Sequence, residues 1–451
     1  KNKATVPANE HEIKDLTELS SRIKIAKPGD VLLLPNGTLK DWTVDIGSSG
    51  TKDAPITIKG RGRDKTIFTG KSAMRLNGSS YVHLKDFSFA DNSGTAVAFN
   101  STRHCSVRHA SFTKIKAQAI INIAGDGKKN QISSCHFSKN PSKNIVIYIG
   151  NHKAPVGTII RDNLFEDVPS IGGNGRETIQ IGQSQTLYGN VNANTLVENN
   201  RFVRCNGEAE IISNKSSGNR YTGNLFLDCN GELVMRGGSG CTIESNRMVN
   251  CAGGIRLSGK NHIVRNNVIW KSRGSGIRLL YGVSDTPPAF YQAVSGCKID
   301  NNTIVNAKDA GILIGASRGK DLLNSPEKRK KLKGTPKRYG THFDMTVAPH
   351  ENTIRYNVVF NQHGNLMTTD QAPQNTFKDN LAFSPLTQAE AGSKYHLLPL
   401  EFVDLDGGNL TLKANNEESA SKGARGKVCE PVRLQKQSES DISNKKLKAT
   451  R

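Results

Sequence analysis

The sequence has few aromatic residues and no long apolar run. Aromatic residues make up 6% of the 451 residues, and apolar residues only 35%. No run reaches the roughly 20 apolar residues that a membrane-spanning helix needs, so the sequence predicts no membrane span. Eight cysteines are too few for a disulfide-stapled scaffold, and they lack the close pairing typical of zinc sites.

Acidic residues are also scarce. Forty Asp and Glu stand against 62 Lys and Arg, which gives a formal net charge of +22. Such an excess predicts an anionic partner: nucleic acid, an acidic membrane surface or an acidic polysaccharide. We expect no nucleic acid, because aromatic side chains for base stacking are rare. Nine basic residues lie in residues 318–338, which we interpret as a solvated insertion loop that also attracts polyanions.

What the sequence does contain is a short repeat. An apolar residue, two or three polar residues that include Asn, and two apolar residues recur along the chain. The clearest copies contain Asn163, Asn200, Asn224, Asn246, Asn267, Asn302, Asn357 and Asn380. A period near 22 residues, without the Leu framework of leucine-rich repeats or the 3.6-residue spacing of helical repeats, is typical of one coil of a solenoid. The sequence therefore predicts an all-β fold, a single right-handed parallel β-helix with inserted loops.

Residues one period apart should stack about 4.8 Å apart on successive coils. The repeat asparagines are then expected to form an internal side-chain ladder that closes turns. Cys205, Cys229 and Cys251 each follow a repeat Asn by five residues. We interpret them as a column of small core residues, in preference to disulfide partners or metal ligands.

Three parts are expected along the chain: an N-terminal cap over residues 1–30, a catalytic β-helix over 31–410, and a C-terminal cap with a flexible tail over 411–451. The first part should contain a helix near residues 10–25, because apolar residues recur there on one helical face. These residues are Ile13, Leu16, Leu19 and Ile23. Such a helix would cover the first coil.

Two acidic residues, Glu208 and Glu210, stand two positions apart in the middle of the array. On a strand both side chains would point to the same side. Like charges so close repel each other unless a cation lies between them, and oxygen ligands suit Ca²⁺. The sequence therefore indicates a Ca²⁺ site, with an exposed acidic pair as the alternative.

Basic residues follow at intervals close to one period. They are Lys215, Arg236, Arg256 and Arg278. We expect one cationic track beside the acidic pair, with a solvated basic face as the alternative. Counted from the preceding repeat Asn, Lys215 lies 15 residues on and Arg236 only 12. A loop or bulge is therefore needed to bring these two residues together.

Such a track suits an acidic polysaccharide built of uronates. A uronate carboxylate bound by Ca²⁺ and Arg loses electron density, which makes the neighbouring C5 hydrogen acidic. A lysine beside Arg236 and Ca²⁺ has a lowered pKa, so Lys215 is the candidate base that removes this hydrogen. Expulsion of the 4-linked oxygen, protonated by Arg236 or by water, completes a β-elimination.

Three strings resemble the sixth polysaccharide lyase family, which contains alginate lyases and chondroitinase B. They are residues 174–182, residues 208–216 and the Met235-Arg236-Gly-Gly motif. The resemblance runs from about residue 8 to about residue 390. It implies a parallel β-helix, Ca²⁺ bound by Asn174, Glu208 and Glu210, Lys215 as the base and Arg236 as the acid.

Within that family, several segments favour alginate as the substrate. Chondroitinase B has His after its catalytic Arg, whereas Gly237 stands here. The segments around Arg256 and His262 look more like those of alginate lyases. Arg256, Arg278 and His262 are therefore candidate substrate contacts, although His262 is equally well explained as a structural histidine.

Other functions stay open at this point. A dermatan sulfate lyase like chondroitinase B, a mannuronan C5-epimerase and a non-catalytic β-helix that binds polyanionic glycans all share features with this chain. The Arg-x-Pro-x-x-Arg signature of pectate lyases and the Gly-His-Gly of polygalacturonases are absent from the sequence. We also expect a secreted or periplasmic protein whose signal peptide has been removed.

Overall fold

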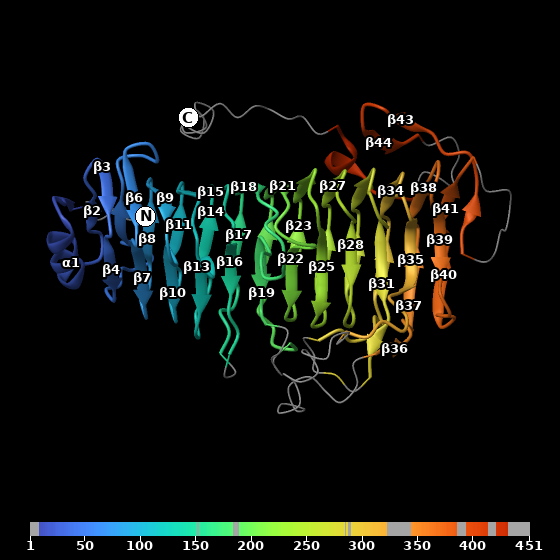
Figure 1. Cartoon of the computed structure of the whole chain (residues 1–451), viewed down its shortest axis with the longest axis horizontal. Coiled ribbons are helices and arrows are strands. Elements are labelled where there is room, and N and C mark those ends of the chain that lie inside the picture. The colour runs from blue at the N-terminus through green and yellow to red at the C-terminus, as the bar shows by residue number, and fades with distance from the viewer. Residues whose placement is uncertain are drawn as a thin grey trace, which may run out of the picture.

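The computed structural model describes residues 9–150, 153–183, 189–284, 286, 290–322, 344–385, 394–413 and 421–431. Its strands wind in successive coils, and three long parallel sheets run along an elongated molecule (Figure 1). We label the three sheets A, B and C. Each full coil contributes one strand to each of them, and along the chain these strands follow in the order C, A, B. This confirms the predicted parallel β-helix. Most of the basic stretch 318–338, from residue 323 on, lies outside the described residues.

Among the described residues, sheet A has fourteen strands, sheet B fourteen and sheet C twelve. In spatial order the strands of sheet A are β1 (Glu10–Glu12), β2 (Val31–Leu33), β5 (Ile56–Lys59), β8 (Val82–Lys85), β11 (Ser106–Arg108), β14 (Gln131–Ser133), β17 (Ile159–Arg161), β20 (Leu196–Glu198), β23 (Arg220–Thr222), β26 (Thr242–Glu244), β29 (Ile263–Arg265), β33 (Lys298–Asp300), β37 (Asn352–Arg355) and β40 (Asn375–Lys378).

Sheet B also has fourteen strands. They are β3 (Gly37–Lys40), β6 (Thr66–Gly70), β9 (Ser88–Asn92), β12 (Ser111–Thr113), β15 (His136–Ser138), β18 (Leu164–Val168), β21 (Arg201–Cys205), β24 (Leu225–Leu227), β27 (Arg247–Val249), β30 (Val268–Trp270), β34 (Thr303–Val305), β38 (Val358–Phe360), β41 (Leu381–Phe383) and β42 (His396–Leu397).

Sheet C has twelve strands and carries the candidate site. They are β4 (Thr43–Ile46), β7 (Ala73–Asn77), β10 (Val97–Asn100), β13 (Ala119–Ala124), β16 (Lys143–Ile147), β19 (Ile179–Ile181), β22 (Glu210–Lys215), β25 (Glu232–Gly237), β28 (Ile255–Leu257), β31 (Ile277–Leu280), β35 (Ala310–Ala316) and β39 (Asn365–Thr369). Two short antiparallel pairs lie outside the three sheets. They are β32 (Gly282–Val283) with β36 (Met345–Val347), and β43 (Phe402–Asp404) with β44 (Asn409–Leu412).

The repeat asparagines form the predicted ladder at the turn between sheets A and B. Asn224 shows the pattern: its Nδ2 donates to the carbonyl of Val197 at 2.9 Å and to Oδ1 of Asn246 at 2.9 Å. Its own Oδ1 accepts from the backbone N–H of Asn200 at 3.0 Å. The residue before each repeat Asn has a positive φ, as at Ser245 (54°). Asp, Asn, Ser and Gly favour or tolerate this conformation, and these residue types supply most of the polar positions of the repeat.

Apolar side chains fill the inside of the coils in stacked columns. One column consists of phenylalanine rings in parallel contact, with centroids 4.6 to 5.8 Å apart. Its members are Phe89, Phe112, Phe137, Phe165, Phe202 and Phe226. Cys205, Cys229 and Cys251 are buried and free of disulfides, and the Cys205 backbone N–H lies 3.4 Å from Sγ of Cys229. This confirms the predicted cysteine column.

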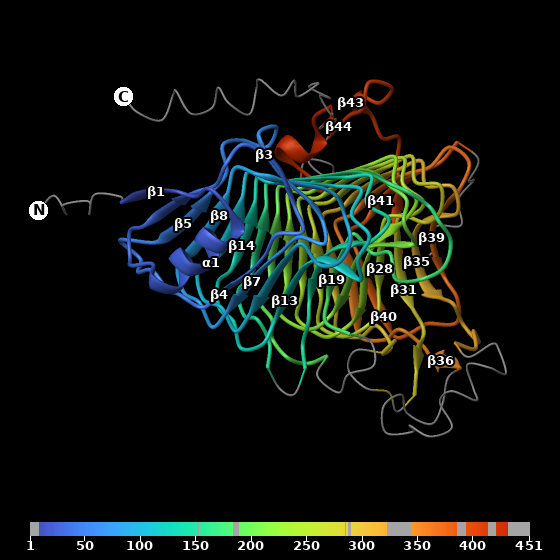
Figure 2. The same ribbon diagram turned by 60° about the vertical axis from the view of Figure 1, so that its left-hand side comes forward.

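The N-terminal end differs in detail from the expectation. The helix α1 (Leu16–Ile25) begins only after Asp15, whose carboxylate caps it by accepting from the Glu18 backbone N–H at 2.8 Å. Residues 10–12 are instead a strand, because they pair with β2 and extend sheet A by one strand. Leu19 and Ile23 are buried, and α1 lies at the first coil of the solenoid (Figure 2).

The C-terminal segment packs along the side of the solenoid. Strands β43 and β44 and the short helix η1 (Gly426–Cys429) lie over the outer face of sheet B (Figure 1). Arg247 of β27 holds this segment, because its guanidinium donates to the carbonyls of Val428 at 2.6 Å and Gly408 at 2.7 Å. In the described part of the chain, no helix is long and apolar enough to cross a membrane.

Candidate active site

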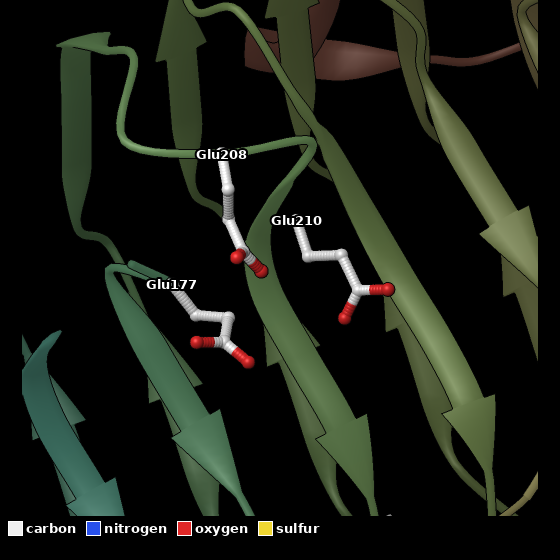
Figure 3. Close-up of side chains that lie close together, drawn as sticks. All are labelled: Glu177, Glu208 and Glu210. Atoms are coloured by element: carbon white, nitrogen blue, oxygen red, sulfur yellow. The ribbon is translucent and has the colours of Figure 1, made fainter. Parts of the chain in front are cut away.

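Three glutamates converge on the outside of sheet C. Glu177 precedes β19, Glu208 lies in the bend before β22, and Glu210 begins β22. A carboxylate oxygen of each lies within 4.8 Å of the others, and Figure 3 shows the three side chains close together, with Glu208 pointing toward Glu177. The solenoid places them together because β19 and β22 are neighbouring strands of the same sheet.

The spacing of Glu208 and Glu210 predicts that both lie on one strand, but Glu208 lies in the bend before β22. Its carboxylate is held by the loop that precedes β19, where the backbone N–H groups of Gly175 and Arg176 donate to Oε2 at 2.6 and 3.2 Å. Burial and the neighbouring Glu177 nevertheless raise the pKa of Glu208, against the effect of these two hydrogen bonds.

Lys215 lies at the end of β22 beside the acidic cluster. Its Nζ is 3.2 Å from Oε1 of Glu177, and its side chain is only 4% exposed. Burial lowers the pKa of Lys215, and the positive charge of Arg236 lowers it further, although Glu177 and Glu210 act in the opposite direction. A buried lysine with a lowered pKa is typical of a base in proton abstraction.

Sequence reasoning missed Glu177. The residue bridges two amines, because its Oε2 lies 3.3 Å from Nζ of Lys143 while Oε1 contacts Lys215. Glu177 stands inside the string 174–182 that carries the family resemblance, and it lies one strand before Glu210 in the sheet. Its place in the string 174–182 was the signal that could have identified Glu177. Because the loops before β19 and β22 differ in length, residue counting did not place Glu177 next to Glu210.

Three extra residues before Lys215 bring it beside Arg236. Two lie in the loop before β22, and the third is Ile211, a bulge on β22, because Glu210 pairs with Glu232 and Ile212 with Leu233. These residues account for the difference in the counts from the repeat Asn. Asn214 then pairs with Met235 and Lys215 with Gly237, so Arg236 is itself an extra residue on β25.

The Arg236 guanidinium stacks on the ring of Tyr291 at 4.7 Å. Burial alone would lower the pKa of Arg236, but Tyr291 and Glu210 raise it, so this guanidinium stays protonated.

The four basic residues do not stand in one register column. Arg256 pairs with Val234 and with Arg278 in the register of sheet C, two positions away from Arg236. The reason is their spacing from the repeat Asn, because Arg256 lies 10 residues after Asn246 whereas Arg236 lies 12 after Asn224. Arg256 and Arg278 instead continue the charged surface one and two coils further on.

These two arginines are paired with glutamates. Arg256 donates to Oε1 of Glu210 at 2.5 Å and lies 3.7 Å from Oε2 of Glu232. Arg278 donates to the same Glu232 oxygen at 2.5 Å. Burial alone would raise the pKa of Glu210, but Arg236 and Arg256 hold it below its ordinary value. The site is therefore an alternating array of carboxylates and cations.

The last two candidates lie in very different places. Asn174 is exposed, next to Gly175 in the loop that holds Glu208. His262 is fully buried: its Nδ1 accepts from the Cys241 backbone N–H at 3.2 Å, and Nε2 lies 3.1 Å from the Ser258 carbonyl. With both ring nitrogens bonded to backbone, His262 occupies a structural position inside the coil and does not face the site.

The acidic cluster has the chemistry of a site for a hard cation. Oε2 of Glu177 is buried and its only partner among the described residues is the ion pair with Lys143 at 3.3 Å. Burial, followed by the charge of Glu177, raises the pKa of Glu208. A divalent cation with oxygen ligands would stabilise the ionised form of Glu208. Glu177, Glu208 and Glu210 could therefore hold a metal ion.

The three parallel sheets and their coil-by-coil winding place the chain among parallel β-helix proteins. The chain matches the family model described as Chondroitinase B over residues 13–391. It therefore belongs to the Chondroitinase B family. No curated protein matches it.

Several solved structures are similar to this chain. The PL6 family alginate lyase AlyGC has 25% sequence identity and a TM-score of 0.77, over 94% of this chain and 58% of that chain. The PL6 family polysaccharide lyase Pedsa3628 from Pseudopedobacter saltans has 24% identity and a TM-score of 0.70, over 93% of this chain and 97% of that chain. A mannuronic acid specific family 6 lyase from human gut microbiota has 22% identity and a TM-score of 0.72, over 87% and 91%. The chain thus spans a little over half the length of AlyGC.

Proposed function

We propose that this protein is a polysaccharide lyase that cleaves a 4-linked uronate polysaccharide, alginate, by β-elimination. Family membership and the similarity to a PL6 alginate lyase support this function. The net charge of +22 supports an anionic substrate. The observation that carries the proposal is the buried Lys215 amine between Glu177 and the bulged Arg236, because it supplies a base beside a fixed cation.

Lys215 and Arg236 are suited to opposite steps of the reaction. The lowered pKa of Lys215 favours its neutral form, which removes the proton from C5 of the uronate. The electron pair of the C–H bond forms the C4–C5 double bond, and the C4–O bond breaks. Arg236 keeps its proton until that stage because its pKa is raised, and its guanidinium, fixed by Tyr291, protonates the leaving oxygen.

Asn174, Glu208 and Glu210, with Glu177 beside them, would hold Ca²⁺. When bound, the ion would neutralise the uronate carboxylate and make the C5 hydrogen more acidic. Ser213 donates to Glu210 and fixes one of its oxygens. Lys143 holds Glu177 from the side away from Lys215, which keeps the base and the carboxylates in one arrangement.

Arg256 and Arg278 are the proposed contacts for uronates further along the polymer. The side chain of Arg278 is 28% exposed and that of Arg256 is 16% exposed. Both lie on sheet C beyond β25, so a polymer that crosses Arg236 continues over them. Because the substrate is a large extracellular polymer, we also propose a secreted or periplasmic location.

A substrate panel tests the proposal. Polymannuronate, polyguluronate and dermatan sulfate are mixed with the protein and Ca²⁺, and ultraviolet absorbance of unsaturated uronate ends is followed. Alginate polymers should give the signal, and a chelator should suppress it. Arg236→Ala should abolish it, whereas Arg265→Ala, which removes an exposed arginine on sheet A, should not.

Dermatan sulfate is the second candidate substrate, because the matching family model is described as Chondroitinase B. Cleavage of dermatan sulfate with no cleavage of alginate would overturn the substrate assignment and leave the lyase chemistry in place. Conversion of mannuronate to guluronate without chain cleavage would identify an epimerase. Binding of alginate without any change in the polymer would identify a non-catalytic glycan-binding protein.

A further inference from the structure

A charged pocket lies on sheet A at strands β8 and β11. These strands stand several coils toward the N-terminal end from β22 of the candidate active site (Figure 1). The pocket has a volume of about 160 Å³. Its lining residues are Thr57, His83, Lys85, Asp86, Arg108 and His109. Strand β11, which carries Arg108, belongs to a coil four before that of β22, or about 20 Å along the axis at the spacing of β-strands.

The parallel register brings the basic groups together. Arg108 pairs with Lys85, and Lys85 pairs with Lys59, so three cations stand in one column on successive strands. The uncharged Ser133 follows in that column, and Arg161 beyond it is paired with Glu198 at 3.6 Å. The basic strip therefore consists of Lys59, Lys85 and Arg108 on three successive coils.

The Arg108 guanidinium is only partly satisfied by the protein. Its Nε donates to Oγ of Ser106 at 3.0 Å. Among the described residues, no carboxylate pairs with it and its two terminal nitrogens make no hydrogen bond. Burial lowers the pKa of Arg108, and the charge of Arg161 lowers it further. Two half-buried N–H₂ groups are therefore available to an anion.

His83 adds a neutral donor to the same pocket. Oγ of Ser106 lies 2.8 Å from its Nδ1. Burial, followed by the charges of Arg108 and Lys85, lowers the pKa of His83 to about 4. The ring is thus neutral near pH 7, and with Nδ1 bonded to Ser106 its proton is placed on Nε2. Asp86 is paired with His109 at 3.7 Å and offsets part of the charge.

We propose that this pocket is a second, non-catalytic site that binds one carboxylate of the anionic polysaccharide. This inference rests on the proposed function for the identity of the polymer. Arg108 and Lys85 bind the carboxylate, and His83 donates to it. The strip formed by Lys59, Lys85 and Arg108 favours a polymer with a charge on each sugar over a small free anion, because neighbouring uronates meet neighbouring coils.

The test measures binding without turnover. Alginate oligosaccharides are titrated calorimetrically into the Lys215→Ala protein and into the same protein with Arg108→Gln added. Lys378→Gln is the matched control, because Lys378 lies in the same column of sheet A and outside the pocket. Arg108→Gln should weaken binding of a long oligosaccharide about fivefold, whereas Lys378→Gln should leave it nearly unchanged.

A second arm separates the polymer from a free anion. Inorganic sulfate is titrated into the same variants. If Arg108→Gln weakens sulfate binding and leaves oligosaccharide binding unchanged, the assignment to the polymer is wrong. If Arg108→Gln and Lys378→Gln behave alike with both ligands, there is no anion site.

Turnover separates this inference from the proposed function. With Lys215 present, Arg108→Gln should raise KM for long alginate and leave the rate on a trisaccharide unchanged. If the wild-type protein cleaves no uronate polymer but Arg108→Gln still weakens alginate binding, the lyase assignment fails and the second site stands. If alginate is cleaved and Arg108→Gln does not change KM for the long polymer, the second-site proposal is wrong and the lyase assignment stands.

Discussion

His262 should make the stability of the solenoid depend on pH. Burial lowers the pKa of His262 from 6.5 to about 4 in the folded protein. The unfolded chain therefore binds a proton between these two pH values while the folded protein does not. It follows that the free energy of unfolding falls as pH decreases from 6.5 to 4, and that the contribution is fully present above pH 6.5.

The size of the effect follows from the same shift. One pKa unit corresponds to about 1.4 kcal/mol, so the change from 6.5 to about 4 amounts to about 3 kcal/mol. Urea unfolding at a series of pH values measures it. Carboxylates and His83 also titrate in this range, so the informative quantity is the difference between wild type and a variant at each pH.

His262→Asn is the matched variant. Equivalent positions of other coils hold asparagines: Oδ1 of Asn219 accepts from the Thr195 N–H at 2.8 Å, and Oδ1 of Asn352 accepts from the Cys297 N–H at 2.9 Å. An Asn at position 262 can accept from Cys241 in the same way and has no titrating ring. If wild type and His262→Asn lose stability in parallel below pH 6.5, His262 is not buried and neutral as described.

Three further results are expected. Asn224→Ala should lower the free energy of unfolding by about 2 to 4 kcal/mol in urea titrations, because it leaves buried ladder partners without hydrogen bonds; an unchanged midpoint would contradict the ladder. Arg247→Ala should speed tryptic cleavage of the C-terminal segment, whose carbonyls at Gly408 and Val428 it holds, and equal cleavage rates would contradict that role. Glu208→Gln should raise the Ca²⁺ concentration needed for half-maximal activity about tenfold or more, and an unchanged requirement would place the ion elsewhere.

The period of the repeat predicted most of the fold. From Asn163 to Asn380, each coil closes the turn between sheets A and B with an Asn, so the repeat is visible as a periodic signal; in the earlier coils Phe87, Ala110 and Cys135 stand at this position. The cysteine column was predicted for the same reason. The strand at residues 10–12 was not, because His11 and its neighbours pair with β2 only once the first coil exists, and their local sequence also suits a helix.

The sequence predicted which residues form the candidate site better than it predicted how they are arranged. Lys215, Arg236 and Glu210 were found from residue types and spacing, and the need for a loop or bulge before Lys215 followed from counting. Where the extra residues lie, in the loop before β22 and at Ile211, depends on packing between β22 and β25. Loop lengths likewise decide that Glu177 meets Lys215, which no periodicity could show.

The central claim is that the Lys215 amine removes a proton from the sugar ring. The most direct test is the mass of the products from alginate made by the wild type, by Lys215→Ala and by Lys298→Ala, a control at an exposed lysine on sheet A. Wild type and Lys298→Ala should give oligosaccharides with an unsaturated end, each lighter by one water than the product of hydrolysis, and Lys215→Ala should give none while remaining folded. Unsaturated products formed by Lys215→Ala at the wild-type rate would contradict the account.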